Sequence, residues 1–220
     1  MAASGRRREA LAAAEAFAAQ ATQATARDAM TSKAEQLRAR RARGPTVKLS
    51  LHGRAVTFVL GDEIVVGRTE GSLQIASAAV SRQHLSIKRD GDGVVVRDLG
   101  GRNGTQLRGL ALGGAVQVGE GLELRLGKEV PVRVTPSAEI AGAIEIELAG
   151  QRYVAPLGPA KLGIGAWRLD LAADGWVELV TDDAPPALAG DVQLVARTTL
   201  LVGDAIATTR HGDPALRVLG

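Results

Sequence analysis

The chain has 220 residues, enough for one large or two small domains, and carries 27 Lys and Arg against 24 Asp and Glu. Hydrophobic residues make up 45% but aromatic residues only 2%, so we expect a core of Val, Leu, Ile and Ala. The chain has no cysteine, which excludes disulfides and thiolate metal sites, and its three histidines lack metal-ligand spacing, so no metal or other cofactor is expected.

Residues 1–45 are predicted to form a helical or flexible basic arm. Residues 6–43 contain no Gly or Pro and are rich in Ala, Gln, Glu and Arg, a composition that favours one long helix ending at Gly44-Pro45. Nine Lys or Arg and four acidic residues give the arm a net charge of +5, which leaves −2 for residues 46–220. The basic balance of the chain therefore belongs to the arm.

Two features of the arm bear on its function. Arg6-Arg7-Arg8 and the Ala-rich stretch after them have a superficial likeness to a signal peptide, but Glu9, Glu15 and two glutamines interrupt the apolar region. No apolar run approaches the roughly 20 residues of a membrane helix, so we expect no membrane contact and a cytoplasmic location. The cluster Arg38–Arg43 is consistent with nucleic-acid binding, but we favour a solvated helix face because aromatic residues for base stacking are nearly absent.

From Thr46 onward the pattern becomes that of short β-strands separated by glycine turns. Alternating or β-branched runs predict strands at 47–51, 55–60, 63–66, 85–88, 94–96, 116–118, 122–126 and 130–134. Strands of this length at regular spacing favour a β-sandwich over 46–135.

Residues 136–142 are predicted to be a linker, followed by a second, degenerate copy of the sandwich over 143–220. The evidence is three pairs of similar segments. They are Gly53–Gly61 with Gly150–Gly158, Gly93–Val96 with Gly175–Glu178, and Val118–Leu122 with Val202–Ile206. Their spacings of 97, 82 and 84 residues imply that the second copy has lost about fifteen residues in its first half. The predicted fold class is all-β, with two sandwiches after a helical arm.

Three short blocks carry the chemistry of the chain, each where a predicted strand ends. They are Gly67-Arg68, Ser81-Arg82-Gln83-His84 and Gly101-Arg102-Asn103-Gly104-Thr105. Arginine's planar fork suits phosphate, a hydroxyl adds a donor, and glycine lets the backbone come close. The blocks contain no plausible nucleophile and base, so we expect an anion-binding protein and not an enzyme.

Together with Asp98-Leu99-Gly100, these blocks resemble the signature of the forkhead-associated (FHA) domain over about 46–134. The resemblance implies an eleven-strand β-sandwich whose loops at one end bind a phosphothreonine peptide. It also implies a bacterial adaptor in Ser/Thr-kinase signalling or in the assembly of a protein complex, with a phosphothreonine protein as partner and a kinase upstream.

The resemblance assigns ligand contacts by position. Arg68 would contact the phosphate and the peptide, Ser81 would donate its hydroxyl to the phosphate, and Arg82 would add charge. Asn103 would hold the peptide backbone beside the phosphothreonine. Arg102 stands where the family often has Ser or Thr, and it either strengthens phosphate binding or points to solvent.

The remaining positions of the blocks would shape the site. By resemblance, Gly67 and Gly104 form the loops, and His84 and Thr105 pack and brace them. The second copy is expected to lack a phosphate site, because Gly165-Ala166-Trp167 replaces the first block and Asp182–Pro186 replaces the third. A scaffold or dimerisation role is the natural expectation for it.

Three alternatives stay open. The sandwich could be a structural assembly subunit with a silent site, or the arm could associate with nucleic acid. Self-association is the third, because Thr25-Ala26-Arg27-Asp28 places an acid three residues after a threonine on the arm.

Overall fold

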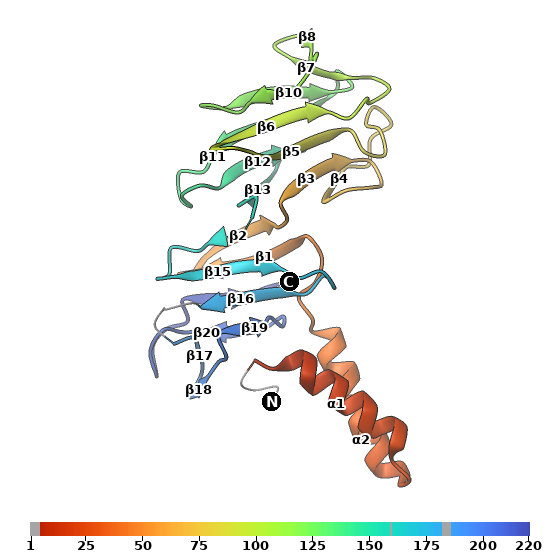
Figure 1. Ribbon diagram of the computed structural model, residues 1–220, viewed down its shortest axis with the longest axis vertical. Coiled ribbons are helices and arrows are strands. Elements are labelled where there is room, and N and C mark those ends of the chain that lie inside the picture. Colours follow the sequence, from red (N-terminus) through yellow and green to blue (C-terminus); the bar gives the residue numbers. More distant parts are fainter. Residues whose placement is uncertain (1–4, 159, 182–185) are drawn as a thin grey trace. The chain divides into compact units, whose positions relative to one another are not determined.

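The computed structural model describes residues 5–158, 160–181 and 186–220, and the chain divides into two compact units (Figure 1). The terminal unit consists of residues 1–55 and 162–220, and the central unit of residues 56–161. Nearly all regular structure after residue 45 is β-strand, which confirms the predicted all-β class with a helical arm.

The arm forms two helices, α1 (Arg7–Gln20) and α2 (Ala24–Ala39), so the prediction of one long helix is wrong. Ala21 leaves the helical region with φ −67° and ψ 125°, and the two helices then lie side by side (Figure 1). Folding back buries Ala14 and Ala34, small apolar side chains that a single extended helix would expose. In the described chain, neither helix has both the length and the apolarity to cross a membrane.

A buried ion pair fixes the start of α1 to the terminal unit. The Arg7 guanidinium lies 2.9 Å from the Asp204 carboxylate and donates a hydrogen bond to the Thr199 carbonyl. Burial lowers the pKa of Arg7 and raises that of Asp204, and the charge of each partner opposes the shift of the other. Since a buried charge without a partner is costly, this pair ties the arm to the unit.

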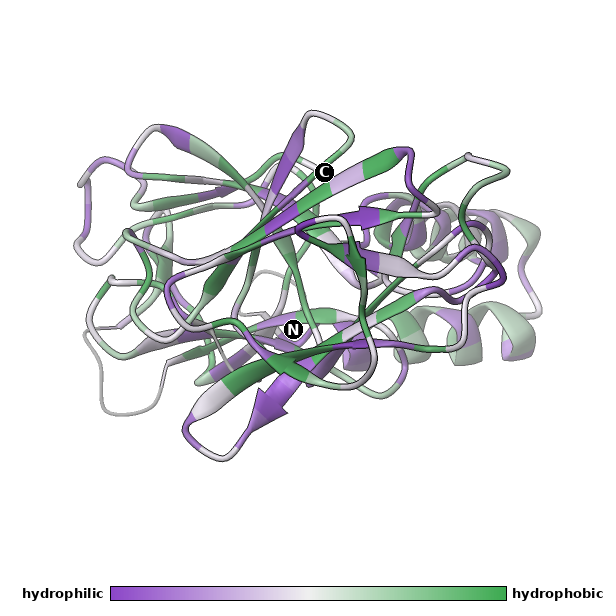
Figure 2. Ribbon diagram, turned by 90° about the horizontal axis from the view of Figure 1, so that it is seen from above, coloured by the Kyte–Doolittle hydropathy of each residue, from purple (hydrophilic) through white to green (hydrophobic). Residues whose placement is uncertain are grey.

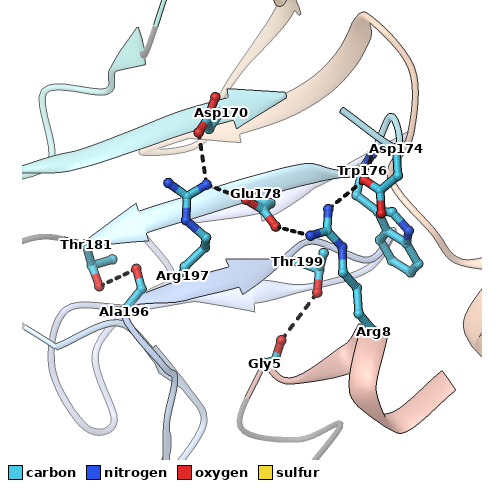
Figure 3. A network of polar contacts seen from close by, with 10 residues as sticks. All are labelled: Gly5, Arg8, Asp170, Asp174, Trp176, Glu178, Thr181, Ala196, Arg197 and Thr199. Atoms are coloured by element: carbon cyan, nitrogen blue, oxygen red, sulfur yellow. Dashed lines mark hydrogen bonds and ion pairs between the residues drawn. The ribbon is translucent and has the colours of Figure 1, made fainter. Parts of the chain in front are cut away.

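The neighbouring Arg8 makes a second anchor (Figure 3). Its guanidinium lies 2.7 Å from the Asp174 carboxylate and 2.9 Å from that of Glu178, and it also lies over the Trp176 ring. Glu178 is buried and receives a further ion pair at 2.5 Å from Arg197. Two cations thus compensate one buried carboxylate on the sheet, and the arm is a docked part of the terminal unit.

The strands of the terminal unit form short antiparallel sheets. They are β1 (Thr46–Leu51), β15 (Trp167–Leu171), β16 (Val177–Thr181), β17 (Leu188–Ala189), β18 (Val192–Gln193), β19 (Arg197–Thr199), β20 (Ala205–Ile206) and β21 (Leu216–Val218). One sheet contains β15-β16-β19 in this order and another contains β20-β21-β1, and β17 pairs with β18. Leu49, Trp167, Leu169, Leu179 and Leu216 are completely buried and form the core of this unit.

The central unit is a sandwich of two sheets. After β2 (Arg54–Val59), which runs into it from the terminal unit, its strands are β3 (Glu63–Gly67), β4 (Leu73–Gln74), β5 (Leu85–Asp90), β6 (Gly93–Asp98), β7 (Thr105–Leu107), β8 (Leu110–Ala111), β9 (Val116–Gln117), β10 (Leu122–Leu126), β11 (Val130–Pro136), β12 (Ile144–Leu148), β13 (Gln151–Ala155) and β14 (Ala160–Lys161). One sheet has the order β4-β3-β5-β6-β9, and the other contains β13-β12-β11-β10-β7-β8. Hydrophobic and hydrophilic residues alternate along these strands (Figure 2), which gives each sheet one apolar face for the shared core.

The division of the chain differs from the predicted one at residues 136–142. Ala143 N–H donates to the Ile140 carbonyl at 3.0 Å, and the Ile140 side chain is buried. The segment is therefore a turn that joins β11 to β12 in one sheet, with Ile146 paired to Val134. Strands β12 and β13 complete the central core, whereas β1 belongs to the terminal unit.

Candidate ligand-binding site

The three sequence blocks meet at one surface depression of the central unit. Its lining includes Arg68 from the β3–β4 loop, Ser81 and Arg82 from the β4–β5 loop, and Arg102 from the β6–β7 loop. The other lining residues are Glu70, Gln83, Leu99 and Gly100. Three guanidinium groups and a hydroxyl thus face one concavity, an arrangement suited to a multiply charged anion.

Backbone hydrogen bonds hold the first two loops together. Arg68 N–H donates to the Ser81 carbonyl at 2.8 Å, and Glu70 N–H donates to the Arg82 carbonyl at 3.1 Å. The loops approach so closely at Gly67 that a Cβ atom there would lie 2.0 Å from the Arg82 carbonyl oxygen. Only glycine fits, so Gly67 sets the distance between the two arginine-bearing loops.

His84 braces the same loops and is completely buried. Its Nδ1 accepts a hydrogen bond from Ser81 N–H at 3.1 Å, so the ring proton of the neutral imidazole lies on Nε2. Nε2 lies 3.1 Å from the Gly104 carbonyl oxygen, to which it donates. One imidazole ring therefore connects the Ser81 loop to the Gly104 loop.

Asp98 shapes the third loop. Its Oδ1 accepts hydrogen bonds from Gly100 N–H at 2.7 Å and Gly101 N–H at 2.9 Å. Burial alone would raise the pKa of Asp98, but the nearby Thr105 hydroxyl and these two N–H groups lower it overall. The ionised carboxylate is thus the form that the folded loop prefers.

We expect Asp98→Ala to lower the stability of the chain near neutral pH and to lose this effect in acid. A carboxyl whose folded pKa is depressed stabilises the protein above its unfolded pKa of about 3.8, and this contribution disappears as pH falls through the folded pKa. Melting temperatures from pH 7 to pH 2.5 measure the difference between variant and native chain. Asp92→Ala, in the exposed turn before β6, is the control and should show no such pH-dependent gap; a gap that stays constant to pH 2.5 would contradict the assignment.

The position of Ser81 leaves its hydroxyl hydrogen available. Its Oγ accepts a hydrogen bond from Arg102 N–H at 3.0 Å, and in the described part of the chain no acceptor is bonded to the hydroxyl hydrogen. Arg102 thus orients Ser81 through its backbone while its side chain lines the depression. An arginine at position 102 makes this contact through its backbone N–H, just as a serine or threonine there would.

The three arginines differ in their surroundings. Arg82 lies 3.7 Å from the Glu70 carboxylate, and both side chains are exposed, so this ion pair is weak and can be exchanged for a stronger anion. Arg68 and Arg102 are also exposed, and among the described residues neither forms an ion pair. Two unpaired cations and one weakly paired cation make the depression electropositive.

Asn103 and its neighbours brace the rim. Asn103 Nδ2 donates to the Ala79 carbonyl at 3.1 Å, which leaves its Oδ1 and second N–H for other partners. Gly104 has φ +65°, a conformation that favours glycine, and Thr105 is buried at the start of β7. Asn103 does not line the depression itself, so the structure brings together the arginines and Ser81 more closely than it brings Asn103 to them.

The sequence analysis named Asp98 in the signature but gave it no role, and it did not name Glu70. For Asp98 a signal was present, because an aspartate two residues before a glycine is typical of a turn closed by its own side chain. For Glu70 no local pattern distinguishes a residue that pairs with Arg82 from a solvated loop charge.

The basic cluster of the arm is occupied by partners within the terminal unit. Arg38 lies 2.7 Å from the Glu15 carboxylate, Arg40 Nε donates to the Val202 carbonyl at 2.9 Å, and the Arg41 guanidinium lies 5.3 Å from the Trp176 ring centre. Structural contacts therefore account for three of its arginines.

The structure describes only part of the segments that correspond, in the predicted second copy, to the binding blocks. Trp167 begins β15 and is completely buried, whereas Asp182–Pro185 lie outside the described residues. Across the described ranges, no group of three or more His, Asp or Glu side chains is placed to hold a metal ion.

Comparison with known proteins agrees with the three blocks. The family model of the FHA domain matches residues 64–127. An FHA domain-containing protein of Arabidopsis thaliana is 36% identical over 92 residues, which are 40% of this chain and 24% of that protein. The chain thus matches about a quarter of the length of this relative.

Solved FHA domains are similar to part of the chain. One from Mycobacterium tuberculosis is 27% identical with a TM-score of 0.31, covering 41% of this chain and 92% of that one. Another, solved in a study of phosphothreonine-dependent FHA domain interactions, is 30% identical with a TM-score of 0.29, covering 38% and 88%. The family match contains all three blocks, so the predicted FHA domain is confirmed.

Proposed function

We propose that the chain is an adaptor whose central unit binds phosphothreonine peptides in Ser/Thr-kinase signalling or in the assembly of a protein complex. The observation that carries the proposal is the convergence of Arg68, Ser81, Arg82 and Arg102 on one depression. The FHA family match and a relative with phosphothreonine-dependent interactions support the same ligand class.

Each residue has a role that its environment supports. Arg68 and Arg102, which form no ion pair among the described residues, bind the phosphate. Arg82 also binds it after its ion pair with Glu70 is broken. Ser81 donates its hydroxyl hydrogen to a phosphate oxygen, because its oxygen already accepts from Arg102 N–H. Asn103 holds the peptide backbone through the groups that it does not use on Ala79.

The energetics are sufficient for an adaptor. A hydrogen bond to a charged group contributes about 1.5–3 kcal/mol, and micromolar binding needs about 8 kcal/mol. Counted as one such bond each, three arginines and one hydroxyl contribute about 6–12 kcal/mol, a range that includes this value. The arrangement suits the binding of an anion. Both ring nitrogens of His84, the histidine beside Ser81, are already engaged in hydrogen bonds with the loops.

The test is a phosphothreonine-oriented peptide library screened against the full chain. Matched phosphoserine and unphosphorylated libraries are the controls. We expect enrichment from the phosphothreonine set alone, with dissociation constants in the micromolar range for the selected peptides. Equal retention of all three sets would contradict the proposal and favour a structural subunit with a silent site.

Self-recognition through phosphorylated Thr25 needs a conformational change. Thr25 lies in the first turn of α2, whereas a bound peptide that presents its backbone to Asn103 must be extended. The first turn would have to unwind before Thr25 could enter a site. We therefore place the ligand on a separate protein.

A further inference from the structure

Paired residues in the two units recur at a constant separation in the sequence. In the central unit β7 pairs with β8 through Gln106 and Ala111, and in the terminal unit β17 pairs with β18 through Leu188 and Gln193. Both partners are displaced by 82 residues, from 106 to 188 and from 111 to 193. The hydrogen bond that closes each hairpin follows the same rule, because Leu112 N–H donates to Thr105 and Leu194 N–H donates to Ala187, both at 2.8 Å.

The next strands continue this correspondence. Arg125 of β10 pairs with Gln106, and Ala207, 82 residues after Arg125, pairs with Leu188. Strand β21 lies 84 residues after β11, since Glu123 pairs with Arg133 and Ala205 pairs with Arg217. The turn before β21 is thus two residues longer. The sequence predicts a spacing of 84 between Val118–Leu122 and Val202–Ile206, whereas strand pairing gives a spacing of 82 between β10 and β20.

The first hairpins of the two copies are equally alike. Strand β1 is followed by the turn His52-Gly53 with φ of +47° and +84°, and β12 by the turn Ala149-Gly150 with φ of +51° and +76°. Two consecutive residues with positive φ are typical of the tight turn that joins antiparallel strands. The hairpins lie 97 residues apart, as the repeated glycines predict.

Their partners, however, are crossed. Strand β12 pairs with β11, the last strand of the first copy, and Glu147 lies opposite Arg133. Strand β1 pairs with β21, the last strand of the second copy, and Ser50 lies opposite Arg217. Ser50 is equivalent to Glu147 and Arg217 to Arg133, so both hairpins join their sheets in the same register. The same structural position is filled in each unit, but by the hairpin of the other copy.

We infer that the two units are copies of one sandwich that have exchanged their first β-hairpins within one chain. The ligand-binding unit is then completed by β12 and β13, which follow it in sequence, and Ile144, Ile146 and Leu148 form part of its core. The arm and β1 complete the copy that lacks the binding loops. Phosphopeptide binding consequently depends on residues 144–155, beyond the segment that the family model matches.

Engineered disulfides in the full chain test the exchange, because the native chain has no cysteine. We expect Ser50→Cys with Arg217→Cys, and Arg133→Cys with Glu147→Cys, to form disulfides within one chain. The control pairs Ser50→Cys with Arg133→Cys, and Glu147→Cys with Arg217→Cys, represent the unexchanged arrangement and should remain reduced. Crosslinking of the control pairs, or a Ser50–Arg217 crosslink that joins two chains, would overturn the inference.

Nuclear Overhauser contacts in the unmodified chain decide the matter if geometry prevents a disulfide. Exchange requires backbone contacts of Leu49 with Val218 and of Ile146 with Val134, which are opposite each other in the two sheets. Contacts of Leu49 with Val134 in their place would overturn it. This measurement does not depend on ligand binding, so it can fail or succeed independently of the proposed function.

Discussion

Replacing Arg68 by alanine is expected to weaken phosphothreonine-peptide binding by about 10- to 100-fold without changing the melting temperature. A charge-assisted hydrogen bond contributes about 1.5–3 kcal/mol, and each 1.4 kcal/mol corresponds to a factor of ten in affinity. The Arg68 side chain is exposed in the depression, and the contact that Arg68 makes with the Ser81 loop uses its backbone N–H, which alanine retains. Calorimetric titration of the full chain with a library-selected peptide measures the loss.

Arg125→Ala is the matched control for this experiment. Arg125 is an exposed arginine of the same unit, on β10 and outside the depression, so its removal changes net charge equally. We expect native affinity in this variant and partial retention in Arg68→Lys, because lysine keeps the charge and loses the planar fork. An equal loss in Arg125→Ala would reduce the role of Arg68 to general electrostatic attraction.

The convergence of the three blocks could be predicted from sequence because each block directly follows or precedes a β-rich run. The loops that join the strands of a sandwich gather at its two ends, so blocks at strand ends are expected to lie close together. The orientation of Ser81 could not be predicted, since it depends on the backbone N–H of Arg102, 21 residues away. The bracing by Asp98 depends equally on how one loop folds around one carboxylate.

The arm illustrates a different limit of the sequence. Composition correctly predicts helix, but Ala-rich segments fit a long helix and a pair of short ones equally well. The choice is made by tertiary contacts, the burial of Ala14 and Ala34 and the anchoring of Arg7 by Asp204. None of these contacts has a local sequence signal.

The partner of each hairpin was beyond prediction for a related reason. Residues Val47–Leu51 and Ile144–Leu148 both alternate apolar with polar side chains, so each can form the same edge of a sandwich. The sequence repeat shows that the two hairpins are equivalent. Because they are equivalent, the sequence does not indicate which of the two sheets each one joins. Only long-range pairing decides which sheet each one joins.

A matched pair of core substitutions is expected to show which sheet each hairpin joins. Ile146 in β12 and Leu49 in β1 occupy equivalent positions, and both are completely buried. Truncation of such a side chain to alanine costs about 2–5 kcal/mol. We expect Ile146→Ala to destabilise the central unit and to weaken phosphopeptide binding, and Leu49→Ala to destabilise the terminal unit while affinity at low temperature stays near native.

Hydrogen exchange of the full chain, read peptide by peptide, locates the damage. In Ile146→Ala the faster exchange should appear in β10 and β11, whose residues share its core, and in Leu49→Ala it should appear in β21. The opposite assignment, with Leu49→Ala loosening β11 and abolishing peptide binding, is what an unexchanged sandwich requires. Because the two substitutions are alike in burial and chemistry, a difference in their location reports which hairpin completes the binding unit, even where both variants lose similar total stability.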